Sequence, residues 1–277
     1  MKSMAEATVN GVRLVYEQRG EGTPLLMICG TGQTAAMWEL GNLLTTIQDA
    51  GCSVATFDNR GIPPSECPEP PWTTGDMADD AIALIEHLEI GPCHLLGASL
   101  GANITQTVAL KRPDLVRSAI FQVGGGNFTL AARLMLEGHL ELMNQGIELP
   151  KALGQATMLD SALTAAQRQD DATVEQILEV TAGLTSSFGP GGQQGQTGAN
   201  VAWSKEDHLA ELADMSVPCL VLAAEHDVFF PPANLKRVAE TIPDARYVEI
   251  PGSAHITTDP AGAKVITDAV REFLSSQ

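Results

Sequence analysis

Short runs of apolar residues alternate along this chain with longer segments in which apolar side chains recur every three or four positions. A continuous apolar run is typical of a strand buried on both faces of a sheet, whereas the wider spacing is typical of an amphipathic helix. Such runs predict strands at residues 24–29, 53–57, 93–96 and 217–224, and we expect further strands at residues 116–123 and 245–250. Because these strands alternate with helical segments, we expect a mostly parallel sheet with helices on both faces.

The first residues predict an antiparallel start to the same sheet. Residues 8–10 and 12–18 have the composition of short strands joined at Gly11, which brings the expected number of strands to eight. The helical spacing predicts helices at residues 35–50, 74–88, 102–112, 234–241 and 260–274.

The alternation stops between residues 127 and 204, where the chain contains helical segments and no convincing strand. These segments cover residues 128–144, 149–168 and 172–184. We therefore expect a core of residues 1–126 and 205–277, interrupted by a helical lid of residues 127–204.

The end of this lid has an unusual composition. Residues 186–200 are rich in Gly and Gln and contain a single aromatic residue, Phe188. Such a composition predicts a mobile loop rather than a packed element. A passive connector and a gate over the site are equally compatible with it.

One predicted strand leads directly into a helix through Gly97–Gly101, whose sequence is Gly-Ala-Ser-Leu-Gly. A serine at the apex of so tight a turn takes a strained backbone conformation that exposes its hydroxyl above the sheet. The flanking glycines fit where a side chain would collide with the crossing strand and helix. Ser99 is therefore the candidate nucleophile.

Two polar residues follow later strands. Asp227 comes just after the strand that ends at Ala224, and His255 follows the strand that ends at Ile250. Ligands of open α/β sheets bind at the carboxyl ends of the strands, so both residues are candidates for the same site as Ser99. His255 would accept the serine proton, and Asp227 would hold the imidazole in the required tautomer.

Glu225 and Asp58 compete with Asp227 for the role of the acid. Glu225 lies two residues earlier and is expected to pair locally at the surface. Asp58 is expected to form a structural ion pair with Arg60, which favours Asp227 as the acid.

The Gly-x-Ser-x-Gly turn, the chain order Ser99, Asp227, His255 and the Gly-Ser-Ala-His segment that ends at His255 together resemble the α/β-hydrolase family. The resemblance covers essentially the whole chain and implies one α/β-hydrolase core with a helical cap. It also implies an oxyanion hole formed by the backbone N–H groups of Thr31 and Leu100.

Two further residues are candidates for the substrate pocket. Gly30 lies at the start of the oxyanion loop, where this chain has Cys29-Gly30 and many relatives have His-Gly. Trp38 could line the pocket or pack in the core, and the core is the commoner place for a tryptophan.

The balance of acidic and basic residues limits the classes of partner that we expect. The 16 basic and 34 acidic residues of this 277-residue chain give a net charge of −18. Such a surface repels phosphate backbones and anionic lipids, so we expect neither nucleic acid nor a membrane as a partner. We expect a small-molecule substrate and a monomer or homodimer.

The cysteines and the N-terminus indicate a location. The five cysteines are irregularly spaced and lack a C-x-x-C pair, which predicts reduced thiols. No apolar segment follows the charge near the N-terminus, and no apolar run reaches the length of a membrane span. These features predict a soluble protein of the cytoplasm.

No motif indicates a cofactor. The chain has no HExxH, no paired Cys/His zinc spacing and no P-loop, so we expect neither a metal nor another cofactor. Gly124–Gly126 is not followed by the Lys and Ser of a phosphate-binding loop.

The resemblance therefore implies cleavage of an ester or thioester of a small, largely apolar molecule through an acyl-Ser99 intermediate. The same triad also serves cofactor-free haloperoxidases or perhydrolases, carbon–carbon bond hydrolases and polyketide-tailoring enzymes. A protein that binds a small ligand without turnover is the alternative of another class.

Overall fold

The computed structural model describes residues 4–185 and 188–277 and contains one eight-stranded sheet with the strand order β1-β2-β4-β3-β5-β6-β7-β8. The strands are β1 (Ala5–Val9), β2 (Val12–Arg19), β3 (Thr23–Ile28), β4 (Cys52–Phe57), β5 (Cys93–Ala98), β6 (Val116–Gln122), β7 (Cys219–Ala224) and β8 (Ala245–Ile250). β2 runs antiparallel to β1 and β4, and all the other pairs are parallel. The expected eight-stranded, mostly parallel sheet is confirmed.

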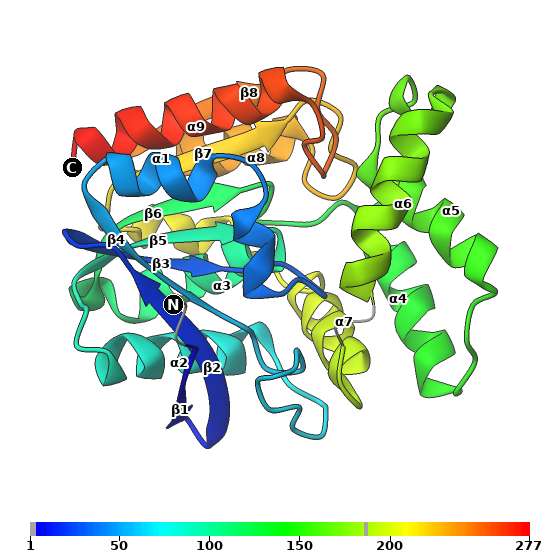
Figure 1. Ribbon diagram of the computed structural model, residues 1–277, viewed down its shortest axis with the longest axis horizontal. Helices are drawn as coiled ribbons and strands as arrows, with labels where there is room; N and C mark the ends of the chain where they lie inside the picture. The colour runs from blue at the N-terminus through cyan, green and yellow to red at the C-terminus, as the bar shows by residue number, and fades with distance from the viewer. Residues whose placement is uncertain (1–3, 186–187) are drawn as a thin grey trace.

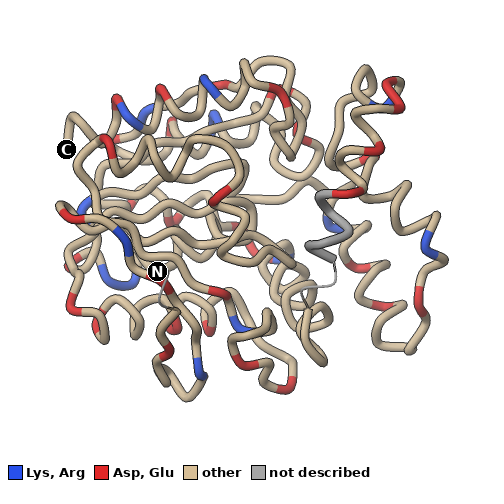
Figure 2. Tube along the Cα trace, in the orientation of Figure 1, with Lys and Arg blue, Asp and Glu red and all other residues tan. Residues whose placement is uncertain are grey.

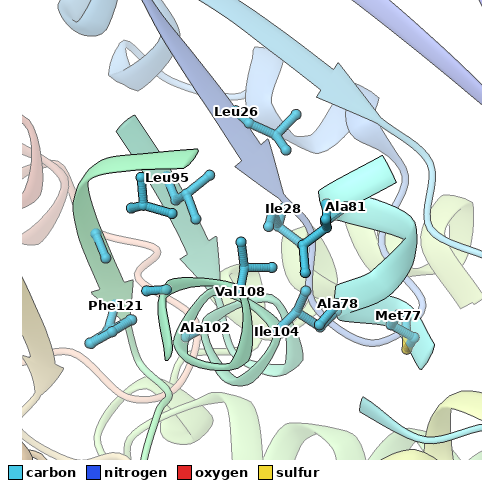
Figure 3. Close-up of a cluster of buried hydrophobic side chains, with 14 of the residues drawn as sticks. Leu26, Ile28, Met77, Ala78, Ala81, Leu95, Ala102, Ile104, Val108 and Phe121 are labelled. Atoms are coloured by element: carbon cyan, nitrogen blue, oxygen red, sulfur yellow. The ribbon is translucent and has the colours of Figure 1, made fainter. Parts of the chain in front are cut away.

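Helices cover both faces of the sheet (Figure 1). One face carries α1 (Leu43–Asp49) and α9 (Pro260–Ser275), and the other carries α2 (Thr74–His87), α3 (Leu100–Lys111) and α8 (Pro232–Thr241). Figure 3 shows the core on the second face, where Leu26, Ile28 and Leu95 of the sheet meet Ala102, Ile104 and Val108 of α3. Burial of these apolar faces fixes the carboxyl ends of β3, β5, β7 and β8 relative to one another.

The segment 35–50, expected as one helix, is broken in the structure. It consists of a 3-10 helix, η1 (Ala35–Glu39), and of α1, and Gly41 between them has a φ of +74°. This left-handed conformation favours glycine and turns the chain between the two helices.

Among the described residues, four α-helices lie between β6 and β7. They are α4 (Leu130–Asn144), α5 (Lys151–Ala162), α6 (Asp171–Thr185) and α7 (Gly192–Trp203). In Figure 1, α4, α5 and α6 stand apart from the sheet, and α7 lies between them and the core. All four helices fall inside the stretch expected to form the lid.

The prediction of a mobile loop at 186–200 is wrong for most of that stretch, because residues 192–200 belong to α7, while residues 186–187 lie outside the described part. A Cβ at Gly192 would meet the backbone of Gly61, and a Cβ at Gly195 would lie 2.6 Å from a ring carbon of Trp72. The glycines therefore allow a close approach of the helix to the core, and packing overrides their low helix propensity.

The expected ion pair between Asp58 and Arg60 does not form. Arg60 instead makes a bidentate pair with Asp80 of α2, at 2.6 Å and 2.7 Å, and its guanidinium lies 5.8 Å from the ring centre of Trp72. Asp58 accepts a hydrogen bond from the backbone N–H of Ala35 at 2.7 Å. The two side chains therefore bind different elements, Asp58 the first residue of η1 and Arg60 the middle of α2.

All five cysteines are free thiols, and four of them are buried, as expected of reduced core residues. Burial raises the pKa of Cys93 and of Cys219 to about 12. Within residues 4–185 and 188–277, no helix is long and apolar enough to cross a membrane.

Candidate active site

Ser99 lies at a sharp turn between β5 and α3 and has a φ of +55° and a ψ of −119°. This conformation is strained for a residue with a side chain. Close packing around the turn maintains it, because a Cβ at Gly124 would lie 2.5 Å from the carbonyl oxygen of Ser99, and a Cβ at Gly101 would meet the backbone of β3. The backbone of Ser99 therefore has neither strand nor helix geometry, and the residue forms the turn between β5 and α3.

His255 connects the serine to a carboxylate. Its Nε2 lies 3.0 Å from Ser99 Oγ, and its Nδ1 lies 2.8 Å from Asp227 Oδ2. The three residues follow β5, β7 and β8, so the parallel sheet brings together groups that are far apart in the chain. This hydrogen-bonded chain can pass a proton from the hydroxyl to the imidazole and stabilise the resulting charge.

Asp227 is buried, and hydrogen bonds to both oxygens of its carboxylate fix the orientation of the group. Its Oδ1 accepts hydrogen bonds from the backbone N–H groups of Phe229 at 2.8 Å and Phe230 at 3.0 Å, which leaves Oδ2 for His255. The Phe229 ring packs edge-on against the imidazole with a centroid distance of 4.9 Å. The side chains of His255 and Asp227 are 15% and 0% exposed, and their burial strengthens the electrostatic interaction between them.

The competing acids lie elsewhere. Glu225 accepts from the backbone N–H of Gly252 at 2.8 Å and remains partly exposed beside His226. Asp58 lies below the loop after β3, where burial raises its pKa to about 6. Of the three candidate carboxylates, Asp227 is the one bonded to His255.

The loop after β3 lies against the serine. A Cβ at Gly30 would lie 3.1 Å from the Cβ of Ser99, and the Gly30 N–H donates to Oε1 of Gln33 at 2.9 Å. The N–H groups of Thr31 and Leu100 donate no hydrogen bond among the described residues. Thr31 follows the glycine that lies against Ser99, and Leu100 follows Ser99 in the chain, so both N–H groups remain candidates for an oxyanion hole.

Trp38 is placed differently from Gly30. It is 7% exposed and belongs to the hydrophobic core cluster that contains Cys29 and Leu44. The core alternative for this tryptophan therefore describes its position.

Across the described residues, no group of three or more His, Cys, Asp or Glu side chains is arranged to hold a metal ion.

A family model described as "alpha/beta hydrolase fold" matches residues 23–259. The chain belongs to the α/β-hydrolase family. This match spans β3 to the loop after β8 and so includes every residue of the site described above.

Several hydrolase-family proteins resemble the chain along most of their length. BpoC of Mycobacterium tuberculosis H37Rv, named as a candidate non-heme bromoperoxidase, is 29% identical over 245 residues, which cover 88% of this chain and 91% of BpoC. Its crystal structure matches with a TM-score of 0.85 at 28% identity, over 95% of this chain and 96% of that one.

Two other relatives have names that state a hydrolytic reaction. The 2-(acetamidomethylene)succinate hydrolase of Mesorhizobium japonicum is 25% identical, covering 97% of this chain and 94% of its own. The rhodomycin D methylesterase DnrP of Streptomyces peucetius is 24% identical, covering 84% of both chains. The family and these relatives support a hydrolase, while the named substrates differ from one another.

Sequence reasoning missed two residues of this α/β hydrolase that contact the loop after β3. Gln196 and Asn200, both on α7, are buried and reach the segment from Thr31 to Gly32. Their spacing of four residues places them on one helical face. That spacing was the available signal, and the Gly-rich composition around it concealed the helix.

Proposed function

We propose that this α/β hydrolase is a serine hydrolase that cleaves an ester or thioester of a small, largely apolar molecule through an acyl-Ser99 intermediate. The observation that carries the proposal is the continuous hydrogen-bonded chain from Ser99 Oγ through His255 to Asp227, at 3.0 Å and 2.8 Å. It is joined to a strained serine backbone and two free N–H groups, which is the set of parts that acyl transfer needs.

In the first half of the proposed reaction, Ser99 Oγ attacks the acyl carbonyl while His255 Nε2 accepts the hydroxyl proton. The negative charge that develops on the carbonyl oxygen is stabilised by the N–H groups of Thr31 and Leu100. Asp227 stabilises the imidazolium. The imidazolium then donates its proton to the alcohol or thiol that leaves, and an acyl-serine ester remains.

In the second half, His255 removes a proton from water as the water attacks the acyl-serine ester. The same N–H groups stabilise the second tetrahedral intermediate. Ser99 regains its proton from His255 as the carboxylic acid is released, so the protein returns to its starting state with no net change. The steps use the substrate, one water molecule and these residues.

An apolar substrate is supported by two features. Phe229 packs against His255 and brings an aromatic surface to the proton-transfer pair. The net charge of −18 disfavours the approach of strongly anionic substrates at low ionic strength.

Five free thiols support action in a reducing compartment, for which we propose the cytoplasm.

The test is covalent labelling by a fluorophosphonate, measured by intact mass for the wild type and for Ser99→Ala. We expect one adduct on the wild type and none on the variant, together with turnover of short-chain or aryl esters and thioesters by the wild type alone. Ser99→Ala and His255→Ala should lower turnover by about 10³-fold or more with the fold intact. Failure of the wild type to label and to turn over any substrate would exclude the proposal and favour a binding protein.

A second candidate is a perhydrolase, favoured by the similarity to BpoC over 88% of this chain. Hydrogen peroxide would replace water as the attacking group on the acyl-serine ester, which releases a peroxyacid and regenerates the serine. The peroxyacid could then oxidise bromide in solution. Bromination of a phenol that needs carboxylic acid, peroxide and Ser99 together would support this reaction, whereas bromination by Ser99→Ala would exclude it.

A further inference from the structure

Helix α7 is bonded to the loop that carries Thr31. Asn200 Nδ2 donates to the Thr31 hydroxyl oxygen at 2.8 Å. Gln196 Oε1 accepts from the Gly32 N–H at 2.9 Å, and its Nε2 donates to the carbonyl oxygen of Arg60 at 3.0 Å. Two side chains of α7 therefore hold Thr31 and Gly32, two consecutive residues of the loop after β3.

The loop depends on contacts of this kind. Thr31 lies between Gly30 and Gly32, and Gly32 has a φ of +70°. Glycines on both sides leave the backbone of Thr31 free to rotate unless other groups restrain it. From the core side, Gln33 binds the Gly30 N–H and Asn59 binds the carbonyl oxygen of Cys29. Among the described residues, the hydrogen bond to Thr31 itself comes from α7.

Asn200 is poorly suited to a purely structural role. It is 4% exposed, and its Oδ1 is buried without a hydrogen-bond partner among the described residues. A buried carbonyl oxygen with no donor lowers stability, and an apolar side chain would avoid this loss. The bond that its amide does make reaches the candidate oxyanion residue.

We propose that Asn200 is a positioning residue that acts through Thr31 to hold the Thr31 N–H in place for the oxyanion. The inference rests on the proposed function, because it assigns α7 a part in stabilising the acyl-transfer transition state. An oxyanion hole contributes when its donors are fixed before the charge develops, so a loosened Thr31 lowers kcat more than it changes KM.

The experiment compares Asn200→Ala, Thr31→Val and the double variant with the wild type in fluorophosphonate labelling and in steady-state hydrolysis of an aryl ester. Thr31→Val keeps the backbone N–H and the shape of the side chain but cannot accept the bond from Asn200. We expect each single variant to lose about 10- to 100-fold in kcat with KM within about twofold. The double variant should lose no more than the worse single variant, because both substitutions break one bond.

Two further variants make the test specific. Thr31→Ser retains the hydroxyl and should recover most of the rate that Thr31→Val loses. Gln194→Ala removes a partly exposed α7 side chain that donates to Asn144 Oδ1 at 2.6 Å and, among the described residues, makes no hydrogen bond to the loop after β3, and its kinetics should equal those of the wild type. If Asn200→Ala does not fold, Thr31→Val still carries the test, since it leaves α7 unchanged.

The outcomes separate the two proposals. A wild type that labels and turns over, with Asn200→Ala and Thr31→Val within twofold of its kcat, overturns the positioning role and leaves the serine hydrolase. Losses that multiply in the double variant also overturn it, because independent effects multiply. A wild type with neither labelling nor turnover overturns the proposed function and this inference with it.

Discussion

At the scale of single residues, the candidate site depends on groups whose surroundings restrict them to one state. Ser99 keeps a φ of +55°, which close contacts with Gly101 and Gly124 impose. Asp227 has each carboxylate oxygen assigned to different donors. Groups that are fixed in this way before a reaction need not reorganise when charge develops, whereas water molecules around a free hydroxyl would have to.

The assignment of donors at Asp227 predicts the effect of Asp227→Asn. The asparagine oxygen would continue to accept from the N–H groups of Phe229 and Phe230, so its amide NH₂ would face His255 Nδ1. Nδ1 must then accept, which places the imidazole proton on Nε2, where it cannot take a proton from Ser99. We expect kcat to fall by about 10³- to 10⁴-fold, measured by ester hydrolysis.

The same variant should keep its thermal unfolding midpoint near that of the wild type, since its backbone contacts remain. An unchanged rate would show that another carboxylate serves as the acid. Glu225→Gln is the matched control and should leave the rate unaffected, because Glu225 bonds to Gly252 and not to His255.

Asp58 predicts a pH effect on stability. Burial raises its pKa from 3.8 to about 6 in the folded protein. Between these values the folded state holds a proton that the unfolded state has lost, so the Asp58 contribution to stability falls as pH rises through this window, and the loss is complete above the folded pKa. Asp58→Asn carries no charge and keeps an acceptor for the Ala35 N–H.

We therefore expect Asp58→Asn to gain stability relative to the wild type as pH rises from about 4 to about 6, by about 2 to 3 kcal/mol in all. Urea unfolding of both proteins at several pH values measures this difference. A difference that is constant with pH would show that Asp58 is ionised over the whole range in the folded protein.

At the scale of secondary-structure elements, the strands and most helices follow from apolar periodicity, and α7 does not. Its sequence Gly-Gln-Gln-Gly-Gln-Thr-Gly-Ala-Asn has low helix propensity and few apolar residues. The helix exists because Gly192 and Gly195 let it approach Gly61 and Trp72, and because Gln196 and Asn200 bond to the core. These contacts join residues more than one hundred positions apart, which local patterns cannot reveal.

This account predicts opposite effects of alanine at two glycines of α7. Gly195→Ala should lower the free energy of unfolding by about 1 to 3 kcal/mol, because its Cβ would lie 2.5 Å from Trp72 Cε2. Gly198→Ala, on the same helix with Leu140 Cδ1 4.0 Å away, should raise it by up to about 1 kcal/mol through helix propensity. Denaturant unfolding measures both, and a gain at Gly195 would contradict close packing at Trp72.

At the scale of the whole molecule, the acidic surface sets the long-range interactions. Figure 2 shows Asp and Glu spread over both helical layers and over α4 to α6, with fewer Lys and Arg among them. Because the net charge is −18, the carboxylates of the folded protein repel one another on balance. The same negative surface potential predicts that neither nucleic acids nor anionic membranes are partners.

The self-repulsion predicts that salt stabilises the protein. Raising NaCl from about 0.02 M to about 0.2 M shortens the range of charge interactions to less than 10 Å, which weakens repulsion between distant carboxylates. We expect the unfolding midpoint to rise by about 2 to 4 °C, with the same shift in KCl. A falling midpoint in a calorimetric scan would instead show that the surface ion pairs outweigh the repulsion.

The sequence by itself determined the layered α/β architecture, because most strands and most helices carry an apolar run or stripe that can be recognised in the local sequence. It also predicted Ser99, Asp227 and His255 as one group, because strand ends in a parallel sheet converge at one edge. The tertiary structure alone decided that Arg60 pairs with Asp80, that Trp38 packs in the core and that α7 is a helix. Each of these outcomes depends on which distant side chain arrives at a position, and that is determined only when the layers pack.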